Sequence, residues 1–440
     1  MSFISFEFLF IFLPIFYILY FLINNISFRN SLLLVFSLFF YAWGEPKRIA
    51  LLLILILLCY VFAYMINRYK KRLLLFILIF ILIFPLIMYK YFLNEMPIGI
   101  SFYTFQLLSY LIDVYMNRCD FEKNIFKLAI YFSMFPIICS GPILRYKDIK
   151  DSISGRTVKI DDIEKGLSRF IIGLSKKIIL ANNLAQIADV AFGIDVHLIN
   201  ANMAWVGSIA YMLQIYYDFS GYSDMAIGLG KMLGFSFKEN FNSPYLSRSV
   251  TDFWRRWHIS LGSWFRDYIY IPLGGNRVST LRWAFNILIV WTLTGIWHGS
   301  SLNFITWGLF YGVMLIIEKK YLRHILEKHV ILSHIYTLSI IFFGWIIFRI
   351  QNVADIPYFV FALIDVRNIG TITELAGQNV LFDIIYIIIG IVCLIPVVKK
   401  PFINIFKHKI IYEFVIVILL IISIVLIENG SYKTFLYFKF

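Results

Sequence analysis

The sequence predicts an all-α membrane protein that crosses the lipid bilayer many times. Hydrophobic residues make up 60% of its 440 residues, charged residues make up 15%, and the mean hydropathy is +0.80. Soluble proteins contain roughly 45–50% apolar residues, and a soluble fold of this length has no interior large enough for so much Leu, Ile and Phe. These observations exclude a disordered chain, a soluble nucleic-acid binder and a secreted disulfide scaffold.

Recurring apolar stretches define the predicted organisation. They lie at residues 8–23, 31–43, 49–66, 73–92, 98–116, 125–140, 167–192, 203–237, 283–297, 302–317, 334–350, 380–398 and 410–427. An untilted helix needs about 20 residues to cross the bilayer, so shorter stretches are expected to be re-entrant or broken, and the estimate is about 11 crossings. No fixed-period repeat divides the chain, so one continuous membrane domain, 1–440, is expected.

The first stretch is interpreted as a retained membrane span. Residues 1–7 carry no basic side chain, and no small-residue cleavage site follows residue 23, which argues against a signal peptide. The loop 67–72 holds four basic residues and no acid. Cytoplasmic loops are enriched in Lys and Arg, so this loop is placed in the cytoplasm and the N-terminus outside. The net charge of +14 reflects either basic cytoplasmic loops or attraction of an anionic cytosolic substrate.

The sequence offers no metal or disulfide framework. Its four cysteines form no CxxC pair, and no two histidines have HExxH spacing, so no metal site is expected. GxSxG and P-loop patterns are also absent from the sequence, which disfavours a serine hydrolase and an ATPase. Three polar constellations inside apolar sequence remain as candidates, because polar groups within lipid are costly and usually functional.

The first constellation spans residues 214–224. Gln214 and Asp218 lie four residues apart and share a helix face, and Gly221 permits the close approach of another helix. An ionised Asp costs several kcal/mol in such a place unless it is paired or hydrated. Two interpretations stay open: Asp218 belongs to a structural polar cluster between helices, or it contacts a substrate.

The second constellation spans residues 251–270 and is predicted to form one amphipathic helix with Thr251 as its N-cap. At 3.6 residues per turn, its aromatic residues gather on one face and most of its charged residues on the other. Such a helix lies in the membrane interface or dips into the protein. His258 lies on the aromatic face, either as a core histidine bonded to a carbonyl or as a functional group.

The third constellation spans residues 291–303. An apolar helix leads to His298, Gly299 is suited to end it, and Ser300 or Ser301 is suited to cap the next helix. The segment is either a tight hairpin at a surface or a helix break at depth, which is tolerated only where it lines a cavity. Desolvation keeps an imidazole there neutral. A neutral imidazole has the lone pair that a general base requires.

Five motifs occur in a fixed order and carry a resemblance. They are YDFSGYSD at 217–224, NFNSPY at 240–245, FWRRWHISL at 253–261, YIYIPLGG at 268–275 and GIWHG at 295–299. With these motifs the chain resembles the membrane-bound O-acyltransferase (MBOAT) superfamily, and in particular its bacterial branch of alginate and peptidoglycan O-acetyltransferases. The segments 6–20 and 435–440 resemble the two ends of proteins in that branch.

The resemblance implies a fold and a chemistry. The implied fold is a bundle of about 11 transmembrane helices, with re-entrant and interfacial helices around a central funnel. In this family the histidine at the position of His298 is catalytic, and the one at the position of His258 lines the same chamber. An acyl thioester enters from the cytosol and an acceptor hydroxyl from outside. The residues expected to contact these substrates are Asp218, Trp254, Trp297 and Asn303.

The implied setting is the cytoplasmic (inner) membrane of a bacterium. Acetyl-CoA is the expected co-substrate, with no bound cofactor, and a cell-surface polysaccharide of the alginate or peptidoglycan type is the expected acceptor. An extracytoplasmic acyltransferase is expected as a protein partner, membrane lipid surrounds the chain, and no nucleic acid is bound.

Three rival functions stay open. One is the D-alanyl branch of the same superfamily, which modifies teichoic acid from a carrier-protein thioester. Another is a transporter or flippase, although such proteins often show inverted halves and no such halves are evident here. The third is a scaffold that only anchors a partner.

Overall fold

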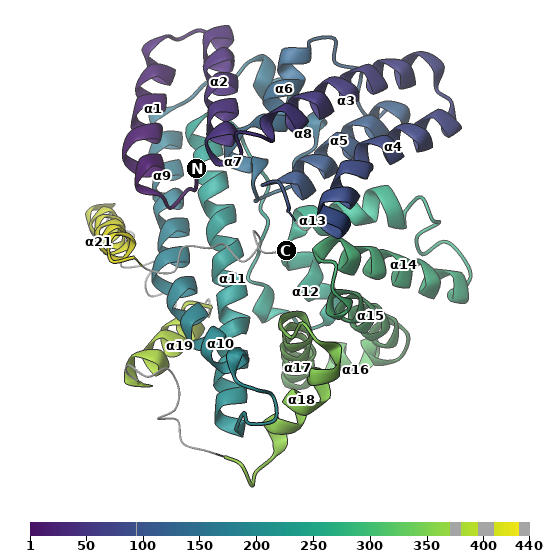
Figure 1. Cartoon of the computed structure of the whole chain (residues 1–440), viewed down its shortest axis with the longest axis vertical. Helices are drawn as coiled ribbons and strands as arrows, with labels where there is room; N and C mark the ends of the chain where they lie inside the picture. Colours follow the sequence, from purple (N-terminus) through teal and green to yellow (C-terminus); the bar gives the residue numbers. More distant parts are fainter. Residues whose placement is uncertain (94, 370–379, 395–408, 431–440) are drawn as a thin grey trace. The chain divides into compact units, whose positions relative to one another are not determined.

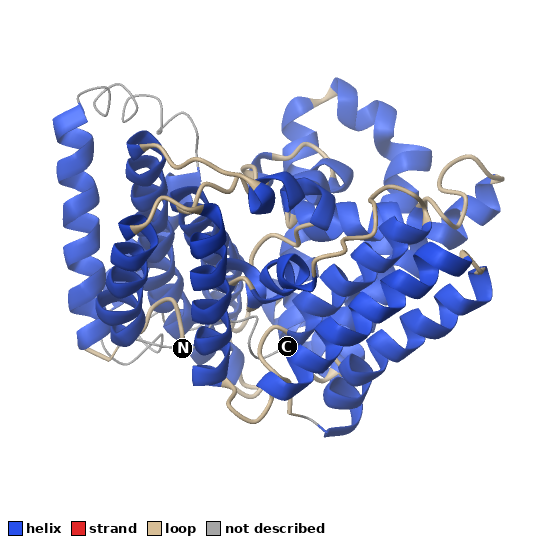
Figure 2. Ribbon diagram, turned by 90° about the horizontal axis from the view of Figure 1, so that it is seen from above, coloured by secondary structure: helices blue, strands red, loops and turns tan. Residues whose placement is uncertain are grey.

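A computed structural model describes residues 1–93, 95–369, 380–394 and 409–430. All regular structure in these residues is helical, and they contain no strand (Figure 1, Figure 2). The predicted all-α class is therefore confirmed. The end of the predicted stretch 380–398 and the segment 435–440 lie outside the described residues.

Six helical segments of the described chain are long and apolar enough to cross a membrane. They are Ile26–Gly44, Ile49–Tyr69, Arg72–Leu93, Leu302–Lys328, Val330–Arg349 and Lys409–Glu428. Shorter apolar helices lie at Phe8–Leu22, Val353–Ile364 and Leu381–Leu394. These segments fit a multi-pass membrane protein, whereas the number of about 11 crossings stays a prediction.

The first compact unit comprises residues 1–170 and 222–239. Its helices are η1 (Phe8–Phe12), α1 (Leu13–Leu22), α2 (Ile26–Gly44), α3 (Ile49–Tyr69), α4 (Arg72–Ile87), η2 (Met88–Leu93), α5 (Ile100–Tyr115), α6 (Ile125–Ser133), α7 (Phe135–Ile138) and α8 (Tyr146–Ser154), together with most of α9 (Ile160–Ser175) and the C-terminal part of α11 (Ala201–Met232).

Helix α5 forms the core of the first unit. Every residue from Ile100 to Val114 is buried, and the helix packs against α3, α4 and α6. Gly99 begins this helix with a φ of +75°, and a Cβ added there would lie 2.0 Å from the carbonyl oxygen of Ile138. Only glycine combines this backbone conformation with so close a contact.

The second unit comprises residues 171–221 and the described residues from 240 onward. Its helices are η3 (Lys176–Ala181), α10 (Asn182–Gly193), the N-terminal part of α11, η4 (Pro244–Leu246), α12 (Val250–Arg256), α13 (Ile259–Phe265), η5 (Arg266–Tyr270), α14 (Thr280–His298), α15 (Leu302–Ile317), η6 (Glu318–Leu322), α16 (Arg323–Lys328), α17 (Val330–Arg349), η7 (Val353–Asp355), α18 (Ile356–Ile364), α19 (Val380–Leu394) and α21 (Lys409–Glu428).

Helices α14 and α15 form a tightly packed hairpin in the second unit. A Cβ added at Gly295 would lie 2.3 Å from the carbonyl oxygen of Phe304, and one at Gly308 would lie 2.3 Å from that of Trp291. Glycines at such contacts let two helix backbones approach closely, as in membrane helix pairs. This hairpin holds His298 at its turn.

The boundary between the units falls inside α9 and inside α11, so each of these two helices contributes one part to each unit. The expectation of one continuous domain, 1–440, stays a prediction.

Candidate active site

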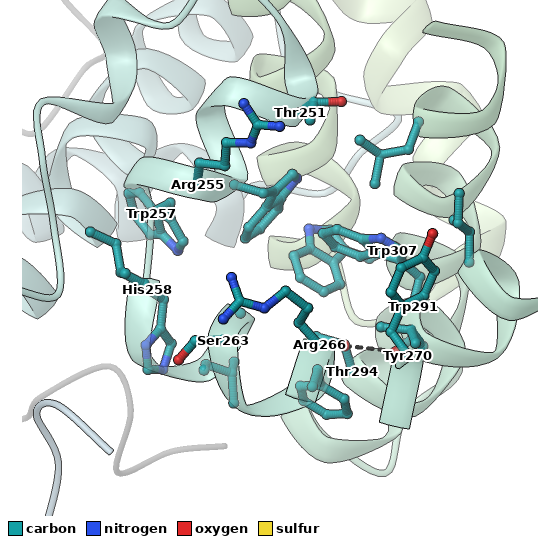
Figure 3. A pocket seen from close by; sticks show the side chains of 18 of the residues that line it. Thr251, Arg255, Trp257, His258, Ser263, Arg266, Tyr270, Trp291, Thr294 and Trp307 are labelled. Carbon is teal, nitrogen blue, oxygen red and sulfur yellow. Dashed lines mark hydrogen bonds between the residues drawn. The ribbon is translucent and has the colours of Figure 1, made fainter. Parts of the chain in front are cut away.

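The second unit contains a cavity of about 420 Å³. Side chains from α12, α13, η5, α14, α15, η6 and α17 line it. Two histidines lie in the wall of this cavity. His258, labelled in Figure 3, lies between α12 and α13, and His298 lies at the end of α14. Two histidines that are distant in the sequence therefore share one chamber.

Trp297 contacts both imidazoles. Its ring centroid lies 6.2 Å from that of His258 and 4.7 Å from that of His298. The two imidazole centroids therefore cannot be farther apart than the sum of these distances. Trp297 is buried, and it is not among the described residues that line the cavity. It therefore supports both histidines through ring contacts.

His298 is held by aromatic rings at the turn of the α14–α15 hairpin. The imidazole is 5% exposed and meets Trp307 and Phe348 edge-to-face, with centroids 4.9 and 5.1 Å away. Helix α14 ends at Gly299 with extended backbone, and a Cβ added there would lie 2.1 Å from the Phe304 ring. The glycine is needed here for close packing and not for a left-handed turn.

The predicted single helix over 251–270 is wrong, because the chain breaks at His258. The segment forms α12, α13 and the π-helix η5, and His258 has a φ of +45° between the first two. A left-handed conformation is uncommon for a residue other than glycine and is found at functional sites. The N-cap of α12 is Ser249, whose hydroxyl accepts a hydrogen bond of 3.0 Å from the amide of Asp252, and not Thr251 as predicted.

Asn240 holds this break in place. Its Oδ1 accepts hydrogen bonds from the backbone N–H and the hydroxyl of Ser260, at 3.2 and 2.9 Å, and lies 3.2 Å from Nδ1 of His258. Its carbonyl oxygen accepts the N–H of Ile259 at 3.0 Å. A backbone N–H can only donate, so the Asn240 atom is an oxygen acceptor and Nδ1 of His258 carries the proton. The lone pair of this imidazole then lies on Nε2.

His258 lies outside the helices that could span the membrane. The side chain is 2% exposed, and burial lowers the pKa of its imidazole from the ordinary value to about 3, because low-dielectric surroundings disfavour the charged form. His258 is therefore a neutral imidazole at physiological pH.

Glu318 fixes the start of α12 from a distant helix. Its carboxylate is 3% exposed and accepts the backbone N–H groups of Val250 and Thr251, at 2.6 and 3.0 Å, and the Thr251 hydroxyl at 2.5 Å. The first N–H groups of a helix have no partner within it, and a carboxylate there also opposes the positive end of the helix dipole. Glu318 thereby positions the helix that carries Trp254 and leads to His258.

Trp254 lines the cavity, as expected of a substrate-contacting residue. It packs edge-to-face against Trp291, Trp307 and Tyr311, with centroid distances of 4.8, 5.5 and 4.9 Å. The indole N–H groups of Trp254 and Trp307 are buried, and neither has a hydrogen-bond partner among the described residues. Both N–H groups are thus shielded from the cavity, and the two indoles contribute ring surface to its wall.

Asn303 is buried behind the hairpin turn and is not among the described residues that line the cavity. Its side-chain N–H₂ donates to the carbonyl oxygens of Ile347 and Phe348, at 3.4 and 2.9 Å, and its Oδ1 accepts the Ser301 hydroxyl at 2.5 Å. These bonds tie the start of α15 to the end of α17, which carries the Phe348 ring against His298.

Asp218 pairs with Lys177 in the interior of the second unit, and each side chain is at most 3% exposed. Gly221 permits this arrangement, because a Cβ added there would lie 2.8 Å from the carbonyl oxygen of Gly173 and 3.3 Å from the Lys177 amide. Asp218 is not among the described residues that line the cavity. The geometry thus supports the structural interpretation of this aspartate.

Three cationic side chains also line the cavity, and the sequence interpretation did not single them out as site residues: Arg255, Arg266 and Lys319. In Figure 3 the Arg266 guanidinium points into the space between His258 and Trp307. Arg255 and Arg266 lie on the charged face of the predicted amphipathic helix, opposite the aromatic face on which His258 is placed. Lys319 carries no sequence signal, because only the tertiary fold brings it to the cavity.

A multi-pass helical protein whose cavity joins two histidines and three cations in a wall rich in tryptophan fits a membrane-embedded group-transfer enzyme. The model of the "MBOAT, membrane-bound O-acyltransferase family" matches residues 122–360. The chain belongs to this membrane-bound O-acyltransferase family and is an integral membrane O-acyltransferase.

Named relatives are consistent with this assignment. A protein named "Probable alginate O-acetylase AlgI" from Pseudomonas fluorescens is 41% identical over 365 residues, which cover 80% of this chain and 73% of that protein. The "Peptidoglycan O-acetyltransferase" of Helicobacter pylori is 33% identical over 403 residues, 78% of this chain and 76% of that protein. The "Teichoic acid D-alanyltransferase" of Bacillus subtilis is 29% identical over 234 residues, 50% of this chain and 58% of that protein.

Proposed function

We propose that this protein transfers an acetyl group from cytosolic acetyl-CoA to an extracytoplasmic hydroxyl, for the O-acetylation of a cell-surface polysaccharide of the alginate or peptidoglycan type. The observation that carries the proposal is the single cavity in which His258 and His298 lie together. The relatives named for O-acetyl transfer match 78–80% of the chain, whereas the D-alanyltransferase matches 50%. This difference favours acetyl over D-alanyl.

In the proposed reaction, His298 is the general base. It takes the proton of the acceptor hydroxyl while the hydroxyl oxygen forms a bond to the thioester carbonyl carbon. The tetrahedral intermediate then breaks its C–S bond, and the imidazolium returns the proton to the leaving thiolate. The products are an acetyl ester and the free thiol of coenzyme A. General base catalysis of this kind contributes about 10²–10⁴ in rate.

The developing oxyanion needs hydrogen-bond donors. Trp254 and Trp307 line the cavity, but their indole N–H groups are buried, so either ring would have to turn toward the cavity to supply such a donor. His258, whose Nδ1–H is directed to Asn240, fits a positioning role in the cavity wall, while His298 takes the single proton of the alcohol.

The cations of the cavity fit an anionic donor. Arg255, Arg266 and Lys319 line it, and guanidinium groups bind phosphates through paired N–H donors. The phosphates of coenzyme A supply such anions. This arrangement gives the net positive charge of the chain a specific use beyond that of basic cytoplasmic loops.

The proposed setting is the bacterial inner membrane with the N-terminus outside. The acceptor is either the polysaccharide itself or an extracytoplasmic acyltransferase partner that completes the delivery. Trp297, Asp218 and Asn303 serve the site through packing and bonding and not through substrate contact.

The function is tested with purified protein in lipid nanodiscs. Acetyl-CoA labelled in the acetyl group is supplied with an alginate or peptidoglycan fragment, and a D-alanyl carrier-protein thioester is supplied in a parallel reaction. Label that enters the glycan as an ester, only from acetyl-CoA, supports the proposal. Transfer only from the carrier thioester assigns the D-alanyl function, and absence of any ester with correctly folded protein contradicts direct acyl transfer to these glycans.

A further inference from the structure

Two arginines of the first unit flank one buried tyrosine. Arg29 lies in the first turn of α2, and its Cζ is 5.2 Å from the ring centroid of Tyr20; Arg156 follows α8, and its Cζ is 5.8 Å from the same centroid. Tyr20 is fully buried, and Arg29 is 8% exposed. We refer to Arg29, Tyr20 and Arg156 as the arginine cluster.

Arg156 is fixed by a dense set of hydrogen bonds. Its Nε donates to the hydroxyl of Tyr20 and the carbonyl oxygen of Leu233, each at 3.0 Å, and its Nη1 donates to Oδ1 of Asn30 and the carbonyl oxygen of Ser152, at 2.7 and 3.1 Å. Its Nη2 is buried and has no partner among the described residues. This nitrogen is shielded by the protein, so Arg156 contributes positive charge to its surroundings and not an open donor.

Arg29 is bonded far less. Its Nε donates to the carbonyl oxygen of Tyr20 at 3.1 Å, and its guanidinium makes no other hydrogen bond to the described residues. Its remaining contacts are with the rings of Tyr20 and Phe21. Both terminal nitrogens of this nearly buried side chain are therefore available as donors.

The arginine cluster has no acidic counterpart. Among the described residues, no carboxylate lies within 4.0 Å of either guanidinium. The carbonyls at the ends of α8 and α11 offset part of the Arg156 charge through the helix dipoles. Arg29, in contrast, donates to one carbonyl oxygen, that of Tyr20. A buried charge without a partner is costly, so an anion is the component that this cluster lacks.

The cluster lies where a lipid headgroup would be found. Arg29 follows the turn between α1 and α2, which are neighbouring apolar helices in Figure 1, and α2 is long enough to span the membrane. Ile18, Leu22 and Ile23, just before this turn, are 68%, 71% and 42% exposed. Exposed apolar side chains beside a charged turn indicate the boundary between acyl chains and headgroups.

We propose that the arginine cluster binds the phosphate group of an anionic phospholipid. The terminal nitrogens of Arg29 supply paired N–H donors that match phosphate oxygens, and Arg156 adds positive charge on the same tyrosine ring. The exposed apolar residues before the turn pack against the acyl chains. This site is independent of the acyl-transfer cavity, so it does not rest on the proposed function.

Native mass spectrometry of the detergent-solubilised protein tests the site, with phosphatidylglycerol and phosphatidylcholine supplied in equal amounts. The expected result is preferential retention of phosphatidylglycerol, reduced about tenfold in affinity in Arg29→Gln, because a charge-assisted hydrogen-bond pair is lost. Arg29→Lys keeps the positive charge but lacks the paired N–H donors of a guanidinium, so this variant is expected to bind phosphatidylglycerol with intermediate affinity. Arg72→Gln, at another charged turn of the first unit, is the control and is expected to bind normally.

Three results would overturn the proposal. Equal retention of the two lipids would show that no anionic headgroup is selected. Equal losses in Arg29→Gln and Arg72→Gln would show only general attraction to positive charge. Binding of added inorganic phosphate without binding of phosphatidylglycerol would assign the site to a soluble phosphate. Arg29 makes one hydrogen bond to the protein, so its variants are suited to remain folded, and their thermal unfolding is measured beside binding.

Discussion

Oδ1 of Asn240 lies 3.2 Å from Nδ1 of His258 and accepts a hydrogen bond from its N–H group. The same oxygen accepts the N–H of Ser260, which identifies it as an acceptor and fixes the tautomer of the imidazole. The hydrogen bond also stabilises the left-handed backbone of His258 between α12 and α13. Asn240 therefore positions His258 within the cavity wall without lining the cavity itself.

Replacing Asn240 with Asp is expected to make activity dependent on pH. Burial lowers the pKa of His258 to about 3, so the native imidazole stays neutral as the pH falls. A carboxylate beside Nδ1 favours the imidazolium and raises this pKa. Activity of Asn240→Asp is then lost on acidification at a higher pH than in the native protein, as measured by the pH profile of kcat. Asn242→Asp is the control, and equal profiles for both variants would contradict this role.

The buried pair of Lys177 and Asp218 is expected to respond strongly to single substitutions. Removing one partner leaves an uncompensated buried charge, at a cost of about 3–5 kcal/mol. Lys177→Met and Asp218→Leu are each expected to lower the unfolding temperature strongly, and the double variant is expected to recover most of this loss. Thermal unfolding in detergent checks the stability.

Acetyl transfer by the double variant separates the two interpretations of Asp218. A stable double variant with near-native transfer supports a structural pair. A stable double variant that binds acceptor poorly would instead assign Asp218 to substrate contact.

Substitution of Glu318 is expected to loosen α12. Glu318→Ala removes the acceptor of two backbone N–H groups and one hydroxyl, and a buried donor left unsatisfied costs about 1–3 kcal/mol. A lower unfolding temperature and a higher KM are expected, because α12 carries Trp254 and Arg255 of the cavity wall. Glu327→Ala breaks an exposed pair with Arg323 and is the control. No difference between these two variants would show that Glu318 does not hold the helix.

The α14–α15 hairpin is expected not to tolerate side chains at its glycines. In Gly308→Leu the new Cβ would lie 2.3 Å from the carbonyl oxygen of Trp291. The two helices must therefore separate, and His298 must move. Loss of folded protein or of transfer is expected in expression and activity assays. Gly155→Ala meets nothing within 4 Å and serves as the tolerant control; a fully active Gly308→Leu variant would contradict the packing described here.

The sequence made the fold class and both cavity histidines predictable. High apolar content implied a multi-pass helical protein, and the two aromatic motifs placed His258 and His298 among tryptophans. The break at His258 was not predictable from helical periodicity, because it depends on Asn240 from another segment. Glu318 and Lys319 gave no local signal, since a charged pair at the end of an apolar helix is ordinary at a membrane surface. Asp218 stood out as an intramembrane acid, but its partner Lys177 comes from a separate helix.

The most direct test of the central claim is single-turnover acetyl transfer by His298→Ala, with Trp297→Phe as a variant that keeps the neighbouring ring. The account predicts that His298→Ala binds acetyl-CoA but forms acetyl ester at least about 10²-fold more slowly. If the two histidines act as a unit, adding His258→Ala to this variant lowers the rate little further. Undiminished ester formation by folded His298→Ala protein would contradict the account.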